Sequence, residues 1–595
     1  MASQKLENLL NLSLEASPGE RERSLELPVG VEEDRWELII KYHGDLGEAL
    51  RRAGLLPADQ DMTAGDLTET VQVEYLLPGY AIMTAGQEAI ALLPSLPEID
   101  FVEKPKALYE GEISIGQGKL ASCVQEVTER EPYLSGQGCL VGIPDSGIDY
   151  KNGVFLDEQG QSRILFLWDQ TLQADKEKNL VSPQGFFHGV EFTKEQLDQS
   201  IVSGAALTFD RSGHGTGVAA IAAGKEGVAP GAGLLVVKLG KGSGAAGSSR
   251  TTELMRAVAW MLQKAQELGM PLAINISYGS TYGSHDGTSL LETFLNSAAE
   301  SYKTVICVGS GNEGAAAGHT QVILDGEKRV ECSIAGYQGA CNISMWKNYG
   351  DVFRLELISP GGGSLEIPLD RIGKREFVLD GTKILFYCGE PAPYTKLQEY
   401  YFDFLGTPYI VAGIWTFVLT PLKVIQGAVS FYLPSAEAVN RGTNFFRPTA
   451  AVSMTIPSTA QKVITVGAYN PLYQEYADFS GRGYLIGEGT AEEGKFFYEQ
   501  QMKPDLCAPG TDLLVPDGQG SYAVVSGTSF AAPFAAGSSA LLMEWGIVQG
   551  NDPYLYGEKV KAYFIKGAKR LPGFTRYPNE MVGWGALCVE NSLPV

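Results

Sequence analysis

The stretch "VVSGTSFAAPFAAGSSALL", from Val524 to Leu542, places a Gly-Thr-Ser sequence directly before a run of small residues. One interpretation is a tight turn that leads into a buried helix. The other is that Ser529 is a nucleophile held at the start of that helix. A serine hydroxyl needs an adjacent base, and the base needs a carboxylate to orient it. The choice between the two therefore depends on partners elsewhere in the chain.

The chain offers one histidine in a suitable setting. Of the five histidines, only His214, in "SGHGTGVAAIAAG", lies in a loop directly before a helix of small residues. Asp145, in "VGIPDSGID", follows an apolar strand, and catalytic groups gather at that end of open α/β sheets. Taken alone, Asp145 could equally cap a turn. The three segments together favour a hydrolytic site.

The order Asp145, His214, Ser529, with "DSGID", "GHGTG" and "GTSFAAP" around these residues, resembles the subtilisin-like serine peptidases of the S8 family. The resemblance covers roughly residues 140–317 and 453–593. It implies that the three residues form a catalytic triad. It also implies that Asn312, in "VICVGSGNEG", stabilises the oxyanion formed during acyl transfer.

Two further segments resemble the substrate-binding parts of that family. "INISYGS" is similar to the strand that forms one wall of the S1 pocket, and "LGKGSGAAGSS" is similar to the edge that pairs with the substrate backbone. The glycines of both segments could equally be ordinary loop residues. The expected substrate-binding residues are Ser277, Tyr278, Gly279, Gly242, Ser243 and Gly244.

The pattern of apolar runs that indicates strands and helices changes several times along the chain. A β-α-β-β-α-β order predicts a small α+β domain, strands alternating with helices predict a doubly wound parallel sheet, and many short apolar runs predict an inserted β-sandwich. The resemblance implies that the small α+β domain is a propeptide domain. The first residues are polar and predict a mobile tail or a loosely attached helix. The expected parts are a tail at 1–34, a propeptide domain at 35–108, the α/β domain at 109–317 and 451–595, and the sandwich at 318–450.

The retained N-terminal domain and the insertion narrow the resemblance. "YHGDL", "FVEKPKALY" and "RYPNEMVGWGALCVENSL" are similar to segments of the clostridial Csp germination proteases. That similarity implies a jelly-roll insertion, a propeptide that is cut off yet stays bound, and activation of a spore cortex-lytic zymogen. The same group contains inactive pseudoproteases, so a signalling or scaffolding role is the alternative; here all three triad residues are present. The sandwich could rigidify the protease or bind a carbohydrate or protein partner.

Composition limits the partners and cofactors. The formal charge of −24 argues against nucleic acid or an anionic membrane surface as a partner and favours solubility. A protein or peptide substrate is what the resemblance to the serine peptidases implies. No apolar run has the length of a membrane span. "AAIAAGKEGVAPGA" closes directly after the helix expected to follow His214, so we expect neither the tight calcium site of many subtilisins nor any other metal or cofactor.

The eight cysteines are scattered without a Cys-x-x-Cys pair, which predicts buried free thiols and no zinc site. The N-terminus lacks the basic start and sustained apolar stretch of a secretory signal. Export by the usual route is therefore not expected. The resemblance to the Csp proteases implies a spore-associated protein, or one released by another route from a clostridial-type bacterium.

Overall fold

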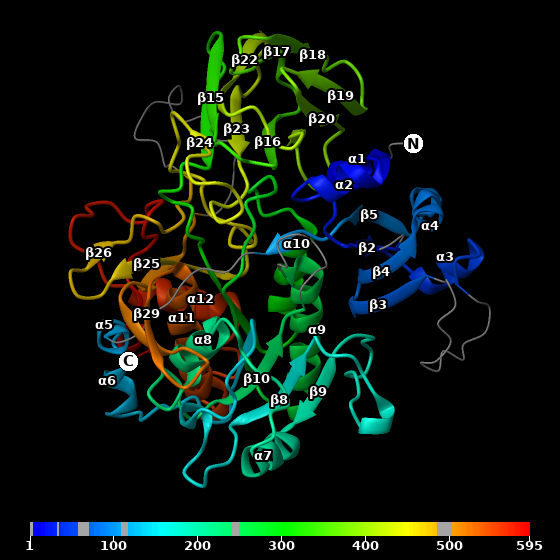
Figure 1. Cartoon of the computed structure of the whole chain (residues 1–595). Coiled ribbons are helices and arrows are strands. Elements are labelled where there is room, and N and C mark those ends of the chain that lie inside the picture. The colour runs from blue at the N-terminus through cyan, green and yellow to red at the C-terminus, as the bar shows by residue number, and fades with distance from the viewer. Residues whose placement is uncertain are drawn as a thin grey trace.

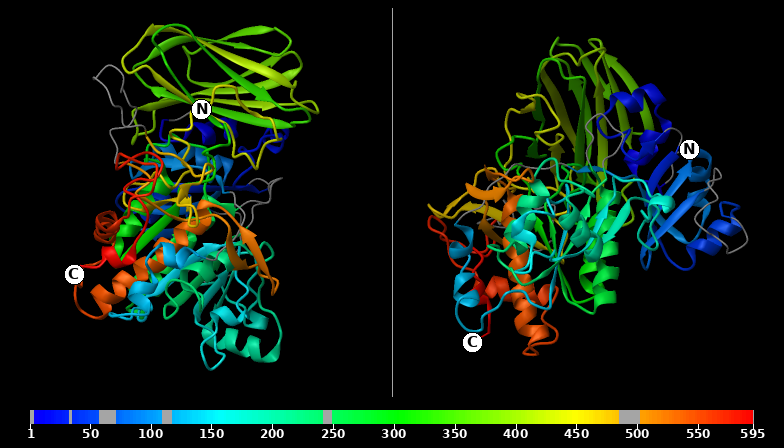
Figure 2. Two further views of the ribbon diagram at one scale, coloured as in Figure 1. Left: turned by 90° about the vertical axis from the view of Figure 1, so that its left-hand side faces the viewer. Right: turned by 60° about the horizontal axis from the view of Figure 1, so that its bottom comes forward.

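The computed structural model describes residues 4–32, 35–56, 71–108, 117–240, 249–484 and 502–594. Figure 1 shows three packed parts: a small N-terminal sheet in blue, a central sheet covered by helices, and a β-sandwich above them in green and yellow. The two views of Figure 2 show the sandwich and the N-terminal part both resting on the central part.

The N-terminal part has the predicted β-α-β-β-α-β order within an antiparallel sheet. Strand β2 (Arg35–Tyr42) lies between β4 (Tyr80–Gly86) and β5 (Ile99–Glu103), and β3 (Gln72–Leu77) pairs with β4. A short strand, β1 (Val31–Glu32), also pairs with β2. The helices between the strands are α3 (Leu46–Arg52) and α4 (Gln87–Leu92).

The prediction of a mobile tail or a loosely attached helix before residue 35 is wrong for residues 4–32, because this segment is partly helical but firmly packed. This segment forms α1 (Asn8–Glu15) and α2 (Pro18–Arg23), and "NLLNLSL" has apolar side chains on two faces of its helix. Leu10 packs into the core of the N-terminal sheet, while Leu9 and Leu12 pack against the sandwich. A helix of eight residues is not stable alone, so burial on both faces is what holds it.

The central part is a nine-stranded sheet, mostly parallel, with helices on both faces. Helices α8 (His214–Ala223) and α11 (Thr528–Met543) cover one face, and α9 (Thr251–Leu268) and α10 (Leu290–Ser301) cover the other. This is the predicted doubly wound α/β arrangement. Its strand order is β26 (Glu475–Tyr476), β25 (Ile464–Asn470), β13 (Thr304–Gly309), β12 (Leu272–Ile276), β7 (Leu140–Asp145), β10 (Gly233–Lys238), β8 (Ile164–Asp169) and β9 (Val190–Thr193), with β27 (Leu506–Pro509) pairing with β25.

Helices α8 and α11 meet through small side chains. Alanines fill the seam from both helices, and Gly537 of α11 lies so close to α8 that an added Cβ would come 2.5 Å from the carbonyl oxygen of Ala222. A side chain there would have to push the helices apart. The run of small residues after Ser529 therefore lets two backbones approach closely.

The remaining elements of the central part lie around its edges. Among them are a hairpin next to α8, a helix that packs against β8 and β9, and helices near the two ends of the domain in sequence. They are α5 (Gly118–Ala121), α6 (Gln125–Thr128), α7 (Lys194–Ser203), α12 (Glu558–Gly567), α13 (Val589–Ser592), and the hairpin strands β28 (Leu513–Pro516) and β29 (Tyr522–Val525).

The insertion is a β-sandwich of two antiparallel sheets around one apolar core, as predicted. The first sheet has the order β14 (His319–Ile323), β23 (Ala428–Tyr432), β16 (Ala340–Asn348), β21 (Leu397–Leu405), β20 (Thr382–Cys388) and β19 (Gly373–Leu379). The second has the order β18 (Ser364–Ile367), β17 (Val352–Ile358), β22 (Gly413–Lys423), β15 (Lys328–Ile334) and β24 (Asn444–Phe445).

The cysteine prediction is wrong at two positions. Cys123 and Cys588, 465 residues apart in sequence, form a disulfide that joins the segment between α5 and α6 to the residue that precedes α13. The other six cysteines are buried free thiols. Burial raises the pKa of the Cys307 and Cys332 thiols to about 12, so both are neutral and unreactive at physiological pH.

One helical stretch among the described residues, Thr528–Val548, is long and apolar enough to cross a membrane by length and composition. Of its most apolar window, 83% is buried inside the protein. This stretch contains α11, the helix that covers the centre of the sheet, so its apolar composition is explained by packing.

Candidate active site

Asp145 and His214 form a buried hydrogen-bonded pair. Asp145 is the last residue of the central strand β7, and His214 is the first residue of α8. The His214 Nδ1 atom lies 2.6 Å from Asp145 Oδ1, and both side chains are almost fully buried. Because the Asp145 carboxylate accepts a hydrogen bond from the Nδ1–H group, Nε2 is the ring nitrogen that can take up a further proton. Such a pair can act as a general base.

The loop before α8 is held by a residue that sequence reasoning missed. The Asp210 carboxylate accepts hydrogen bonds from the Gly213 and Thr216 backbone N–H groups, at 3.1 and 3.0 Å, and from the Ser146 hydroxyl at 2.9 Å. It thus joins the start of α8 to the residue after Asp145. Asp210 lies three residues before the N-cap residue Gly213, so the usual capping pattern does not identify it from the sequence.

Ser529 lies in the first turn of α11, where backbone N–H groups have no partner within the helix. Its hydroxyl donates to the Ser277 carbonyl oxygen at 3.1 Å, and the Ser277 hydroxyl donates back to the Ser529 carbonyl oxygen at 2.7 Å. The neighbouring Phe530 ring lies 5.1 Å from the His214 ring, centroid to centroid. The seam between α8 and α11 therefore brings the serine and histidine segments together.

Asn312 lies beside Ser529, and its amide has a defined orientation. Its Oδ1 atom accepts from the Thr528 backbone N–H at 3.0 Å and from the Thr528 hydroxyl at 3.2 Å. Because a backbone N–H can only donate, the oxygen must face Thr528 and the Nδ2 group faces elsewhere as a donor. Asn312 and Ser529 line one cavity of about 40 Å³ together with the predicted S1 residues Ser277, Tyr278 and Gly279.

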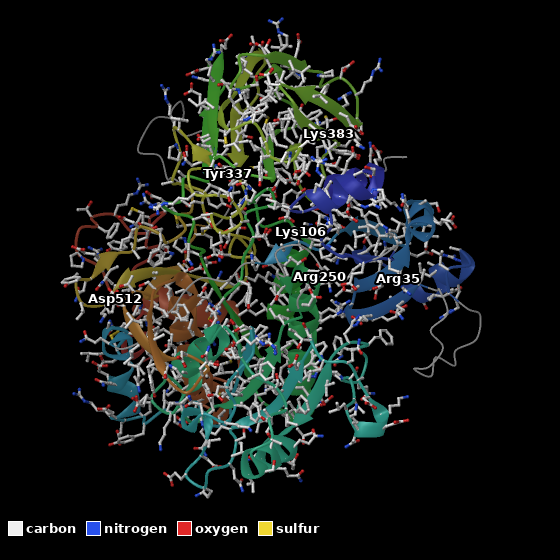
Figure 3. The ribbon with its side chains drawn as sticks, viewed as in Figure 1. Arg35, Lys106, Arg250, Tyr337, Lys383 and Asp512 are labelled. Carbon is white, nitrogen blue, oxygen red and sulfur yellow. A yellow bond between two sulfur atoms is a disulfide. The ribbon has the colours of Figure 1, made fainter. Side chains whose placement is uncertain are left out.

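The end of the N-terminal part lies along the edge that was predicted to bind substrate. Strand β6 (Ala107–Leu108) pairs antiparallel with β11 (Ser249–Arg250), and the Thr251 N–H donates to the Lys106 carbonyl oxygen at 2.9 Å. Figure 3 labels Lys106 and Arg250, which lie where the blue sheet meets the central part. Gly242, Ser243 and Gly244 lie outside the described residues.

The other histidines are not placed as bases. His285 and His319 both stack on Tyr432, and burial lowers their pKa values to about 4 and about 3. His43 and His188 lie on the N-terminal sheet and at its contact with the central part, where they face Asp100 and Glu74. Among the described residues, no group of three His, Cys, Asp or Glu side chains is arranged to hold a metal ion.

Comparison with known proteins agrees with this geometry. Residues 136–378 and 438–585 match the subtilase family of peptidases. The chain belongs to the subtilase family. Residues 4–106 of this subtilase match the Csp protease B prodomain, so the prodomain includes α1 and α2 and starts well before residue 35.

The similarity to a solved Csp structure extends over most of the chain. The Clostridium perfringens CspB protease is 32% identical, with a TM-score of 0.71, and the match covers 80% of this subtilase and 96% of that chain. The PII-type proteinase of Lactococcus lactis subsp. cremoris is 24% identical over 477 residues, which are 74% of this chain and 24% of the proteinase. The AprX serine protease of Bacillus subtilis is 29% identical over 152 residues, which are 23% of this chain and 31% of AprX. This subtilase therefore spans less than a third of the length of those two relatives.

Proposed function

We propose that this subtilase is a serine endopeptidase that cuts its own prodomain and then a protein substrate. The observation that carries the proposal is the buried Asp145–His214 pair beside the helix that begins at Thr528–Ser529. A pseudoprotease or scaffold would not require this pair, and all three triad side chains are present. The family resemblance further suggests a spore cortex-lytic zymogen as the substrate and a spore-associated location; both stay predictions.

The proposed reaction begins with a rotation of the Ser529 hydroxyl away from the Ser277 carbonyl and toward His214. As Oγ attacks the scissile carbonyl carbon, Nε2 of His214 takes the hydroxyl proton, and Asp145 stabilises the imidazolium. The same proton passes to the departing amine when the C–N bond breaks. A water molecule then attacks the ester carbonyl carbon of the acyl-enzyme and gives a proton to His214. The bond from that carbon to Ser529 Oγ breaks, His214 returns the proton to Oγ, and the acid product leaves.

The oxyanion that forms on the carbonyl oxygen needs donors that are already in place. The Asn312 Nδ2 group and the Ser529 backbone N–H are the two donors proposed here. We expect Asn312→Ala to lower kcat by about 10²–10³-fold with little change in KM, because the bond strengthens only as negative charge develops. Steady-state kinetics on a peptide substrate measure this. An unchanged kcat with an altered KM would contradict the assignment.

The prodomain tail gives the most direct test of the proposed activity. Strand β6 already lies along the edge at β11, as a substrate strand would, so the first bond cut should lie between Lys104 and Gly118. Wild-type protein should run as two fragments that co-purify, and the cutting rate should not depend on protein concentration. Ser529→Ala should stay one chain.

A control variant separates loss of chemistry from loss of structure. Ser538 lies on the same helix, is also fully buried and also lies among small residues, so Ser538→Ala should be cut like the wild type. Fragmentation of the Ser529→Ala protein at the same bond, in a host without other proteases, would refute self-processing.

A further inference from the structure

The cavity beside Ser529 is small because the Thr455 side chain fills the space between two of its wall segments. Two wall segments, 277–279 and 309–312, come from the chain just after β12 and from the end of β13 and the residues after it. Thr455 lies between them, and Ser435 and Glu437, which follow β23 in the insertion, also line the cavity. The space that remains is about 40 Å³. A single water molecule needs about 10–15 Å³ of such space, and a benzene ring fits a cavity of about 150 Å³. The cavity therefore has room for a small side chain but not for an aromatic ring.

Hydrogen bonds on both sides hold the backbone around Thr455. The Thr455 N–H donates to the Ser310 carbonyl oxygen at 3.1 Å, on the second wall segment. Ile456 and Ser280 exchange two backbone hydrogen bonds, at 2.8 and 2.9 Å, just past the first wall segment. Thr455 is therefore fixed between the walls rather than carried on a free loop.

The Thr455 side chain fills the gap between two glycines. A Cβ added to Gly279 would come 2.2 Å from Thr455 Oγ1, and one added to Gly311 would come 2.5 Å from the same atom. Both glycines therefore lie in close contact with this side chain from opposite walls. Thr455 is 8% exposed, so it is packed rather than turned toward solvent.

The inserted sandwich closes the far end of the cavity. The Ser435 hydroxyl donates to Glu313 Oε1 at 2.6 Å, and the Ala436 N–H also points to this carboxylate at 3.4 Å. Burial raises the pKa of Glu313, because a charged carboxylate is poorly solvated there. Glu313 is thus engaged with the sandwich and is a weak partner for a cationic substrate side chain.

We propose that Thr455 sets the specificity of this subtilase by restricting P1, the residue on the amino side of the cut bond, to glycine, alanine or serine. This inference rests on the proposed peptidase function. Discrimination by a single methylene in such a pocket is about 10–200-fold, so leucine or phenylalanine at P1 should be strongly disfavoured. The self-processing cut should accordingly follow a small residue of the expected interval. These are Ala107, Gly111, Ser114 and Gly116.

The test uses two peptidyl diphenyl phosphonates that differ only in the P1 analogue, alanine or phenylalanine, on the full-length protein. Wild-type Ser529 should react at least about tenfold faster with the alanine analogue. Thr455→Ala, which removes Oγ1 and Cγ2, should lower this ratio at least about tenfold by admitting the larger ring. Thr455→Val, which keeps the volume and removes the hydroxyl, should keep the wild-type ratio.

A small fluorophosphonate that has no P1 side chain distinguishes failure of the P1 inference from failure of the proposed peptidase function. If it labels Ser529 but the phenylalanine analogue reacts as fast as the alanine analogue, the inference is overturned and the peptidase function stands. An unchanged ratio in the Thr455→Ala variant has the same meaning, as does a self-processing cut after a large residue. If the fluorophosphonate does not label folded protein, the proposed function and the inference both fall. Should Thr455→Ala not fold, Thr455→Ser, which removes only the methyl group, replaces it with the same expected direction.

Discussion

Replacing Asp145 with asparagine is expected to slow self-processing by about 10⁴-fold while leaving the fold intact. The Asp145 carboxylate lies 2.6 Å from His214 Nδ1 in a buried site. An asparagine amide can donate a hydrogen bond to Nδ1, which would leave the proton on Nε2 and remove the base that faces the serine. The rate constant for cutting of the prodomain, followed by gel over time, measures the loss.

The matched control is Asp370→Asn, at an aspartate of the sandwich whose side chain is 72% exposed. This variant should process at the wild-type rate. A rate within tenfold of wild type for Asp145→Asn would mean that Asp145 does not orient the base. Equal melting temperatures for the two variants would show that any difference is chemical.

Replacing Arg256 with alanine is expected to weaken the attachment of the prodomain by about 3–5 kcal/mol. Arg256, on α9, is 3% exposed; its Nη1 atom lies 2.6 Å from Glu37 on β2, and its Nε atom donates to Glu74 on β3. Burial alone would raise the pKa of Glu37, but the charges of Arg256 and Arg250 outweigh it and lower that pKa to about 2. Without Arg256, two buried carboxylates lose their main partner.

The measurement is co-purification of the cut prodomain with the rest of the protein. Wild-type fragments should stay together on a sizing column, and the Arg256→Ala fragments should separate. Arg354→Ala, at an exposed arginine of the sandwich, should behave as wild type. The triple variant Arg256→Met, Glu37→Gln, Glu74→Gln should recover much of the attachment, because no unpaired charge is left buried. Continued co-purification of the Arg256→Ala fragments would contradict this account.

The features that could be predicted from the sequence are those that depend on the pattern of residues close together in the chain. The residues flanking Asp145, His214 and Ser529 are typical of strand ends and helix starts, and the structure places all three at such positions. The alternation of strands and helices, and its replacement by short apolar runs in the insertion, likewise predicted the α/β sheet and the sandwich.

The parts that were missed depend on contacts between distant segments. The helix at Asn8–Glu15 is too short to be recognised without the two surfaces that bury it. Nothing in the spacing of Cys123 and Cys588 indicates that they meet. Thr455 lies 143 residues after Asn312, on the far side of the insertion, and only the folded chain places it against Gly279 and Gly311.

The seam of small residues between α8 and α11 has a consequence for how such an enzyme can change over evolution. Because Gly537 leaves no space for a Cβ against Ala222, any larger residue there would displace the helix that carries Ser529 relative to the helix that carries His214. Ser529 and His214 are thus positioned by backbone contact, which tolerates little variation. The cavity beside Ser529 is instead lined in part by side chains, those of Thr455 and of the inserted residues Ser435 and Glu437. If the proposed specificity holds, selection can alter which bonds are cut by exchanging these side chains while the contact between the two helices is kept.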